Sequence, residues 1–332
     1  MHQRGQMVIE QITSEVLRGN ALNDPHTREL FVYLPPSYER EPKRRFPVVY
    51  CLTGFTGRGR MLLNTQAFSP NLAERMDALI ACGHAGEMIL VMPDCFTRLG
   101  GSQYINSTAT GRYEDHLIKE IVPFVDRHFR TRAEVAGRAV VGKSSGGYGA
   151  LVNAMRHADV FGAAASHSGD CYFEYGYLPD FPKTFRAIAG DVGKFIEKFW
   201  SEEKKGKNDI TALNIIAMSA CYSPDPSAPL GFRMPFDTTT GEIDNEVWGR
   251  WLTHDPVRMV EHHAEHLRSL KLLYLDAGTQ DEFHLDTGAR ILAARLREHN
   301  VQFIHEEFDD GHMNTSYRYN RSLALLSHAL EA

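Results

Sequence analysis

The chain has 332 residues, of which 43% are hydrophobic, and a formal net charge of −6 at pH 7. Because acidic and basic residues are interspersed and form no broad basic face, we do not expect nucleic acid as a partner. No apolar stretch is long enough to cross a bilayer, and residues 1–20 lack the apolar core of a signal peptide, so we expect no membrane partner and a cytoplasmic location.

Two segments near the start are rich in β-branched and aromatic residues and predict an antiparallel strand pair. They span residues 7–17 and 29–34 and are separated by the turn-like Asn23-Asp24-Pro25.

Short apolar runs follow, alternating with segments of helical periodicity. The runs lie at residues 46–52, 88–92, 139–141, 163–166 and 271–275, and the helical segments at residues 71–82, 111–129, 145–157 and 287–299. This alternation predicts an α/β fold, with a mostly parallel sheet, helices on both faces and functional side chains at the carboxyl ends of the strands. Residues 171–266 break the pattern and predict a cap inserted after the sixth strand into a core of residues 1–170 and 267–332.

The most informative motif is Gly142-Lys143-Ser144-Ser145-Gly146, which lies between a predicted strand and a predicted helix. In that context a G-x-S-x-G pattern makes its serine, Ser144, a candidate nucleophile. The glycines have a steric reason, because a chain that reverses sharply from strand to helix leaves no room for Cβ atoms.

A serine hydroxyl needs a general base, which is usually an imidazole oriented by a carboxylate. Two later loops, each after a predicted strand, supply these groups: Asp281 lies in residues 276–283 and His312 in residues 308–314. We prefer Asp281 to Asp276 because it lies in the middle of its loop, where its side chain can reach an imidazole. Glu282 is the next candidate, and solvent exposure or helix capping is its alternative role.

An acyl-transfer site also needs backbone donors for an oxyanion. We expect these donors to be the N–H of Ser145 and the N–H of Phe55, which lies in the glycine-rich loop after the third strand. The side chains or backbone expected to line the substrate pocket are Gly54, Thr56, Phe173 and Met313.

Other histidines are not expected to act in catalysis. His167, at the end of a predicted strand, is expected in the structural core or the pocket wall. His262, His263 and His266 share a helix spacing, but no further ligand is evident, so no metal site is predicted.

The chain resembles the putative-esterase (esterase D-like) branch of the α/β-hydrolase superfamily. The resemblance rests on the serine motif, on residues 101–107 and 111–115, on the acid loop 278–283 and on Gly311-His312. It implies an eight-stranded sheet and hydrolysis of esters through an acyl-enzyme, with no metal or organic cofactor. Relatives often have histidine at the positions of Thr53 and Lys143, and a lysine beside the nucleophile is either a salt-bridged bystander or a bias toward anionic substrates.

The function expected is therefore that of a serine carboxylesterase acting on a small-molecule ester. Thioester hydrolysis of the S-formylglutathione hydrolase kind or acyl transfer uses the same triad and stays an alternative. A peptidase, a non-catalytic binding module on a hydrolase scaffold and assembly into a homo-oligomer also stay open.

Overall fold

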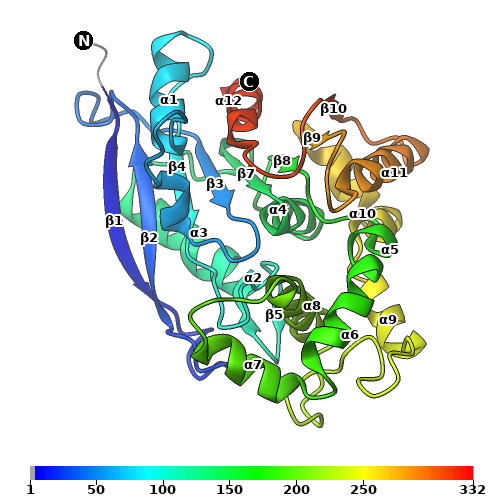
Figure 1. Cartoon of the computed structure of the whole chain (residues 1–332). Coiled ribbons are helices and arrows are strands. Elements are labelled where there is room, and N and C mark those ends of the chain that lie inside the picture. The colour runs from blue at the N-terminus through cyan, green and yellow to red at the C-terminus, as the bar shows by residue number, and fades with distance from the viewer. Residues whose placement is uncertain (1–3, 332) are drawn as a thin grey trace.

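The computed structural model describes residues 4–331. An eight-stranded sheet runs through the molecule in the order β1-β2-β4-β3-β7-β8-β9-β10, and β5 pairs with β6 in a separate small hairpin (Figure 1). Strand β2 is antiparallel to β1 and β4, and the other neighbours in the large sheet are parallel. The strands are β1 (Gln6–Thr13), β2 (Thr27–Leu34), β3 (Val48–Leu52), β4 (Ile89–Pro93), β5 (Asn106–Ser107), β6 (Gly111–Arg112), β7 (Arg138–Lys143), β8 (Ala163–His167), β9 (Leu272–Gly278) and β10 (Ile304–Phe308). The predicted α/β fold with eight mostly parallel strands is confirmed.

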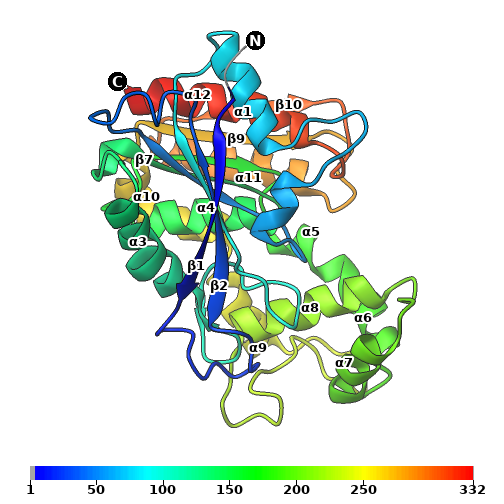
Figure 2. The same ribbon diagram turned by 90° about the vertical axis from the view of Figure 1, so that its left-hand side faces the viewer.

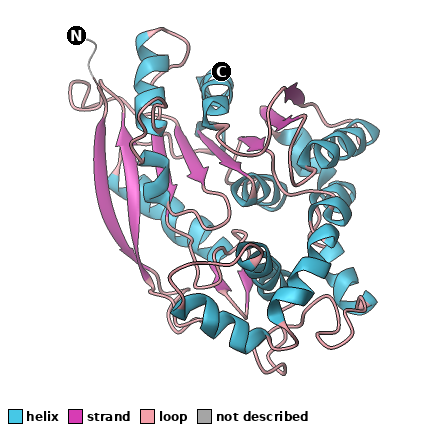
Figure 3. Cartoon of the chain, viewed as in Figure 1, coloured by secondary structure: helices cyan, strands magenta, loops and turns pink. Residues whose placement is uncertain are grey.

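Helices cover both faces of the sheet, as the ribbon views show (Figures 2 and 3). On one face α12 packs against α1 and against β7, β8 and β9. On the other face α4 packs against β3, β7 and β8, α11 packs against β9, and α10 packs against both helices. The helices of these layers are α1 (Leu72–Ala81), α2 (Tyr113–Asp115), α3 (Val122–His128), α4 (Ser145–Arg156), α10 (Pro256–Ser269), α11 (Leu285–Glu298) and α12 (Tyr319–Glu331). None of the helices within residues 4–331 combines the length and apolar character that crossing a bilayer requires.

Two apolar cores result, one on each face of the sheet. Along β3, Val48, Tyr50 and Leu52 belong to one core and Val49 and Cys51 to the other, and all five are fully buried. Successive side chains of a strand point to opposite faces, so a strand that is covered on both sides is apolar at every position. This explains why the central strands read as continuous apolar runs.

The chain between β8 and β9 is mainly helical. It contains α5 (Phe173–Gly176), α6 (Phe181–Ile188), α7 (Val192–Ser201), α8 (Asp209–Tyr222), α9 (Asn245–Leu252) and α10. Helix α8 packs against α6, α7 and α9, and these helices form the lower part of the molecule in Figure 1. Helix α10 packs on α4 and α11 and so adds to the helical layer on that face of the sheet. The predicted boundaries of the cap, residues 171–266, stay a prediction.

The predicted strand at residues 7–17 is shorter in the structure, where β1 ends at Thr13. The carboxylate of Glu120 accepts hydrogen bonds from the N–H groups of Glu15 and Val16 and from the Ser14 hydroxyl. Those backbone donors are therefore satisfied without a partner strand. Glu120 itself lies on a π-helical turn, His116–Ile121, that joins α2 to α3 in place of one regular helix.

We expect Glu120→Gln to destabilise the fold by about 1–3 kcal/mol near neutral pH, because several of its hydrogen bonds are made to the charged form. Burial acts to raise the pKa of Glu120, but hydrogen bonds from His116, Ser14 and the Val16 N–H lower it to about 2. A carboxyl with a lowered pKa stabilises the fold above its unfolded pKa of about 4.3, and this contribution disappears as the pH falls toward 2.

Urea unfolding of the wild type and the variant at several pH values between 7 and 3 measures this difference. The exposed Glu134→Gln is the matched control and should change stability by less than about 0.5 kcal/mol. A Glu120→Gln effect that stays constant down to pH 3 would contradict the prediction.

Candidate active site

Ser144 lies in a sharp turn between β7 and α4. Its backbone has φ +57° and ψ −127°, a conformation that non-glycine residues rarely adopt. The Ser144 N–H donates to the His167 carbonyl at the end of the neighbouring β8, at 2.9 Å, which helps to hold this strained residue. Strain of this kind at a serine is typical of functional sites.

The glycines beside Ser144 permit close backbone contacts. A Cβ atom on Gly142 would lie 2.3 Å from the Gly146 backbone, and one on Gly146 would lie 2.2 Å from the Leu52 carbonyl oxygen. The loop after β3 can therefore press directly against the start of α4.

We expect Gly146→Ala to destabilise the protein by about 1–3 kcal/mol, because the added methyl group collides with backbone that cannot move independently. The matched control is Gly249→Ala, on the exposed surface of α9, where an added Cβ meets no atom within 4 Å. This change should instead stabilise the helix by up to about 1 kcal/mol. Urea unfolding of both variants checks the opposite signs, and equal effects at the two positions would contradict the steric argument.

His312 and Asp281 form a buried hydrogen-bonded pair. The distance from His312 Nδ1 to Asp281 Oδ2 is 2.8 Å, and the side chains are 6% and 0% exposed. The other oxygen of Asp281 accepts the Phe283 N–H, and the His312 N–H donates to the carboxylate of Glu282. The imidazole is thus oriented with Nδ1 toward the carboxylate and Nε2 away from it.

The local charges keep Asp281 ionised. Burial acts to raise the pKa of Asp281, but the hydrogen bond and the charge of His312 lower it below its usual value. Burial also lowers the pKa of Lys143, an effect that the carboxylates of Asp281 and Glu282 oppose. A carboxylate that remains charged can orient and stabilise an imidazolium.

Ser144 and His312 line the same pocket. Within residues 4–331 no hydrogen bond joins Ser144 Oγ to His312 Nε2. Catalytic hydrogen bonds are often long or misaligned before substrate binds and become shorter in the complex.

The amide N–H groups of Phe55 and Ser145 have no acceptor among the described residues, and Phe55 follows Gly54, whose Cβ position would contact Ser144. Ser145 begins α4, where N–H groups lack intrahelical acceptors. Thr53 is held by Tyr104: the tyrosine hydroxyl donates to the Thr53 carbonyl at 2.8 Å.

The pocket has a volume of about 630 Å³, which is the size of a typical small-molecule site. Gly54, Thr56, Phe173 and Met313 line this pocket, and their contact with a substrate stays a prediction. Its mouth also carries four exposed apolar side chains: Met61, Ile210, Phe283 and Met313.

Several lining residues were missed by the sequence analysis, and Asp170 is the most informative of them. It lies three residues beyond the end of β8. A carboxylate just beyond the carboxyl end of a parallel strand is a signal that could have found it.

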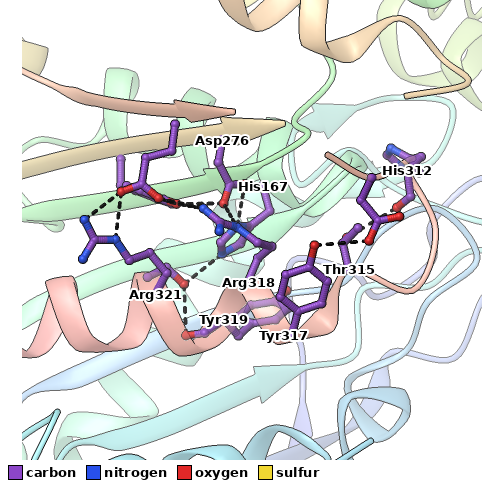
Figure 4. A network of polar contacts seen from close by, with 12 residues as sticks. His167, Asp276, His312, Thr315, Tyr317, Arg318, Tyr319 and Arg321 are labelled. Carbon is purple, nitrogen blue, oxygen red and sulfur yellow. Dashed lines mark hydrogen bonds and ion pairs between the residues drawn. The ribbon is translucent and has the colours of Figure 1, made fainter. Parts of the chain in front are cut away.

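Asp276 and His167 belong to a different, buried network (Figure 4). His167 Nδ1 lies 2.8 Å from Asp276 Oδ1, His167 Nε2 lies 2.8 Å from Ser322 Oγ, and the Arg318 guanidinium donates to Asp276 Oδ2. Burial acts to raise the pKa of Asp276, but His167 and Arg318 lower it. The sequence predicts His167 either in a structural role or in the pocket wall. It is buried and does not line the pocket, so its role is structural.

The histidines of α10 pack against the core layer. His266 Nδ1 lies 2.6 Å from the Met155 carbonyl oxygen, and its ring lies 5.9 Å from that of His263. In residues 4–331 no three or more His, Cys, Asp or Glu residues are grouped as metal ligands would be.

Comparison with known proteins gives consistent results. A segment of 83 residues is 41% identical to an esterase of Mycobacterium tuberculosis, and 144 residues are 31% identical to an endo-1,4-beta-xylanase/feruloyl esterase of Xylanibacter ruminicola. These segments cover 25% and 42% of this chain, but only 18% and 19% of the two relatives.

Among solved structures, a ferulic acid esterase superposes with a TM-score of 0.65 at 21% identity, over 98% of this chain and 99% of the other. This likeness shows a shared fold. The family model described as "Putative esterase" matches residues 20–324. The chain therefore belongs to this esterase family and has the α/β-hydrolase fold.

Proposed function

We propose that the protein hydrolyses carboxylic esters of small molecules through an acyl-enzyme on Ser144. The observation that carries the proposal is the meeting of three groups at one pocket: strained Ser144, His312, and Asp281 bonded to that imidazole. Membership of the esterase family and the printed names of its relatives support the same reaction class.

In the first half-reaction, Ser144 Oγ attacks the ester carbonyl carbon while His312 Nε2 takes the hydroxyl proton. Asp281 holds the ring and stabilises the imidazolium. The N–H groups of Phe55 and Ser145 donate to the oxyanion, and one such donor can be worth about 3 kcal/mol in the transition state. His312 then protonates the leaving alcohol as the carbon–oxygen bond breaks.

In the second half-reaction, water attacks the acyl-enzyme and His312 takes one of its protons. Collapse of this tetrahedral intermediate breaks the bond to Ser144 Oγ. The proton returns to that oxygen, and the carboxylic acid leaves. Every group returns to its starting state, so the proposed reaction consumes only ester and water.

The shape of the pocket favours a substrate larger than a formyl or acetyl ester. Its volume of about 630 Å³ and its apolar mouth suit an ester with apolar acyl or alcohol parts. Part of the wall comes from the predicted cap region, through Tyr177, Asp180 and Ile210, so we assign that region a role in substrate selection. A thioester hydrolase or acyltransferase would use the same groups and differ in leaving group or acceptor.

A fluorophosphonate probe tests the proposal directly, because it reacts with an activated serine. We expect labelling at Ser144, mapped by peptide mass spectrometry, together with hydrolysis of chromogenic acetate and butyrate esters. Comparison of oxygen esters with matched thioesters, and of water with added alcohols as acceptors, separates the alternatives. An unlabelled Ser144 in folded protein that hydrolyses none of these substrates would refute the proposal.

A further inference from the structure

Asp170 is a buried carboxyl group in the wall of the pocket. It is 8% exposed and lines the same pocket as Ser144 and His312. Its Oδ2 atom lies 3.4 Å from Ser145 Oγ, beside the proposed nucleophile. The mechanism above gives this group no role.

The donors around Asp170 converge on one of its two oxygens. Oδ2 accepts hydrogen bonds from the Tyr177 hydroxyl at 2.8 Å and from Gln103 Nε2 at 3.1 Å, besides the contact with Ser145. No described residue donates to Oδ1, and Oδ1 is not among the polar atoms sealed from solvent without a partner. Oδ1 is therefore an acceptor that is open to the pocket.

Three other buried aspartates in this protein use both oxygens. Asp255 accepts from the N–H of Tyr172 on Oδ1 and from that of Phe173 on Oδ2. Asp276 and Asp281 are likewise bonded through both atoms. An unmet acceptor in a buried site is costly until a donor arrives, so the free oxygen of Asp170 is suited to a donor group.

The surroundings hold Asp170 in place. Gln103 is fully buried, its backbone has a left-handed φ of +52°, and its Nε2 also donates to the Tyr222 hydroxyl at 2.7 Å. Burial raises the pKa of Asp170, whereas the hydrogen bonds from Tyr177 and Gln103 act to lower it. A strained and bonded support of this kind is typical of a preorganised binding group.

We infer that Asp170 Oδ1 binds a hydroxyl group of the ester substrate; this inference rests on the proposed function. A neutral hydroxyl is favoured over an ammonium group because Lys143 lines the same pocket and would repel a cation. The protein is thus assigned to esters with a hydroxylated acyl or alcohol part, and Asp170 to a specificity-determining role.

Matched ester pairs test this inference on the wild-type protein. Methyl 3-hydroxybutyrate is compared with methyl butyrate, methyl 4-hydroxycinnamate with methyl cinnamate, and 2-hydroxyethyl butyrate with propyl butyrate, by acid release in a pH-stat. For at least one pair we expect kcat/KM to favour the hydroxylated ester by about tenfold to a hundredfold, the effect of one hydrogen bond to a charged group. The O-methyl ether of that substrate, which cannot donate, should lose the advantage.

Asp170→Asn should remove or reverse the preference. Its amide oxygen is held toward Tyr177 and Gln103, so its NH₂ group faces the pocket. This group can donate to a hydroxyl or an ether oxygen alike but cannot accept, so the hydroxyl should lose its advantage over the O-methyl ether. Asp159→Asn makes the same chemical change at an exposed residue outside the pocket, and should keep the wild-type ratio.

Ratios within about twofold of one for every wild-type pair would overturn the inference, as would an unchanged preference in folded Asp170→Asn. Both outcomes still leave ester hydrolysis and labelling of Ser144 intact. Failure of the proposed function instead appears as no hydrolysis of any ester and no labelling.

Discussion

Replacing Ser144 by alanine is expected to lower kcat for a chromogenic acetate ester by about 10⁴- to 10⁶-fold, while leaving the fold intact. The loss is large because no other hydroxyl occupies the strained turn between β7 and α4 beside His312. The alanine side chain is smaller than serine, and Ser144 is not a buried packing residue, so stability should change little. Steady-state kinetics with thermal unfolding measures both effects.

The matched control for Ser144→Ala is Ser322→Ala. Ser322 also contacts a histidine, His167, that is paired with an aspartate. However, Ser322 is fully buried on α12 and does not line the pocket. The control should retain kcat within about threefold, because it removes a single core hydrogen bond worth about 1 kcal/mol. If Ser322→Ala abolishes activity in folded protein and Ser144→Ala does not, the assignment of the nucleophile is wrong.

The part of the site that sequence could predict is local. The G-x-S-x-G motif fixes a strand, a turn and a helix within a few residues, and the structure shows β7, Ser144 and α4 there. The loops with Asp281 and His312 each follow a strand, and parallel strands bring their carboxyl ends to one edge of the sheet. That geometry is sufficient to favour the pairing seen between the two side chains.

What sequence could not predict depends on contacts between distant segments. Asp170 acquires its surroundings from Gln103 and Tyr177, and no periodicity joins these residues. The predicted strand at residues 139–141 extends over Arg138–Lys143 in β7, because strand pairing continues through residues that are not apolar. Likewise, the early end of β1 depends on Glu120, which lies over a hundred residues away.

Asp281 and Asp276 lie five residues apart, yet the structure gives them different partners. Asp281 contacts the pocket histidine, whereas Asp276 contacts His167 and the Arg318 guanidinium in the core (Figure 4). Asp276 ends up there because it lies within β9, paired with His167 of β8, while Asp281 follows the strand. One aspartate can therefore be tested against the other.

Asp281→Asn is expected to lower kcat by about 10⁴-fold, because an amide stabilises the imidazolium poorly and favours the wrong tautomer of His312. Asp276→Asn should act mainly on stability, costing about 1–3 kcal/mol because it removes a charged hydrogen-bond acceptor, while Arg318 keeps its ion pair with Glu306. Its kcat should change by less than about tenfold wherever the variant is folded. Steady-state kinetics and urea unfolding of both variants separate the two roles. A kcat within about tenfold of the wild type in Asp281→Asn would mean that another group orients His312. Glu282, which accepts the His312 N–H, would then be the next to replace.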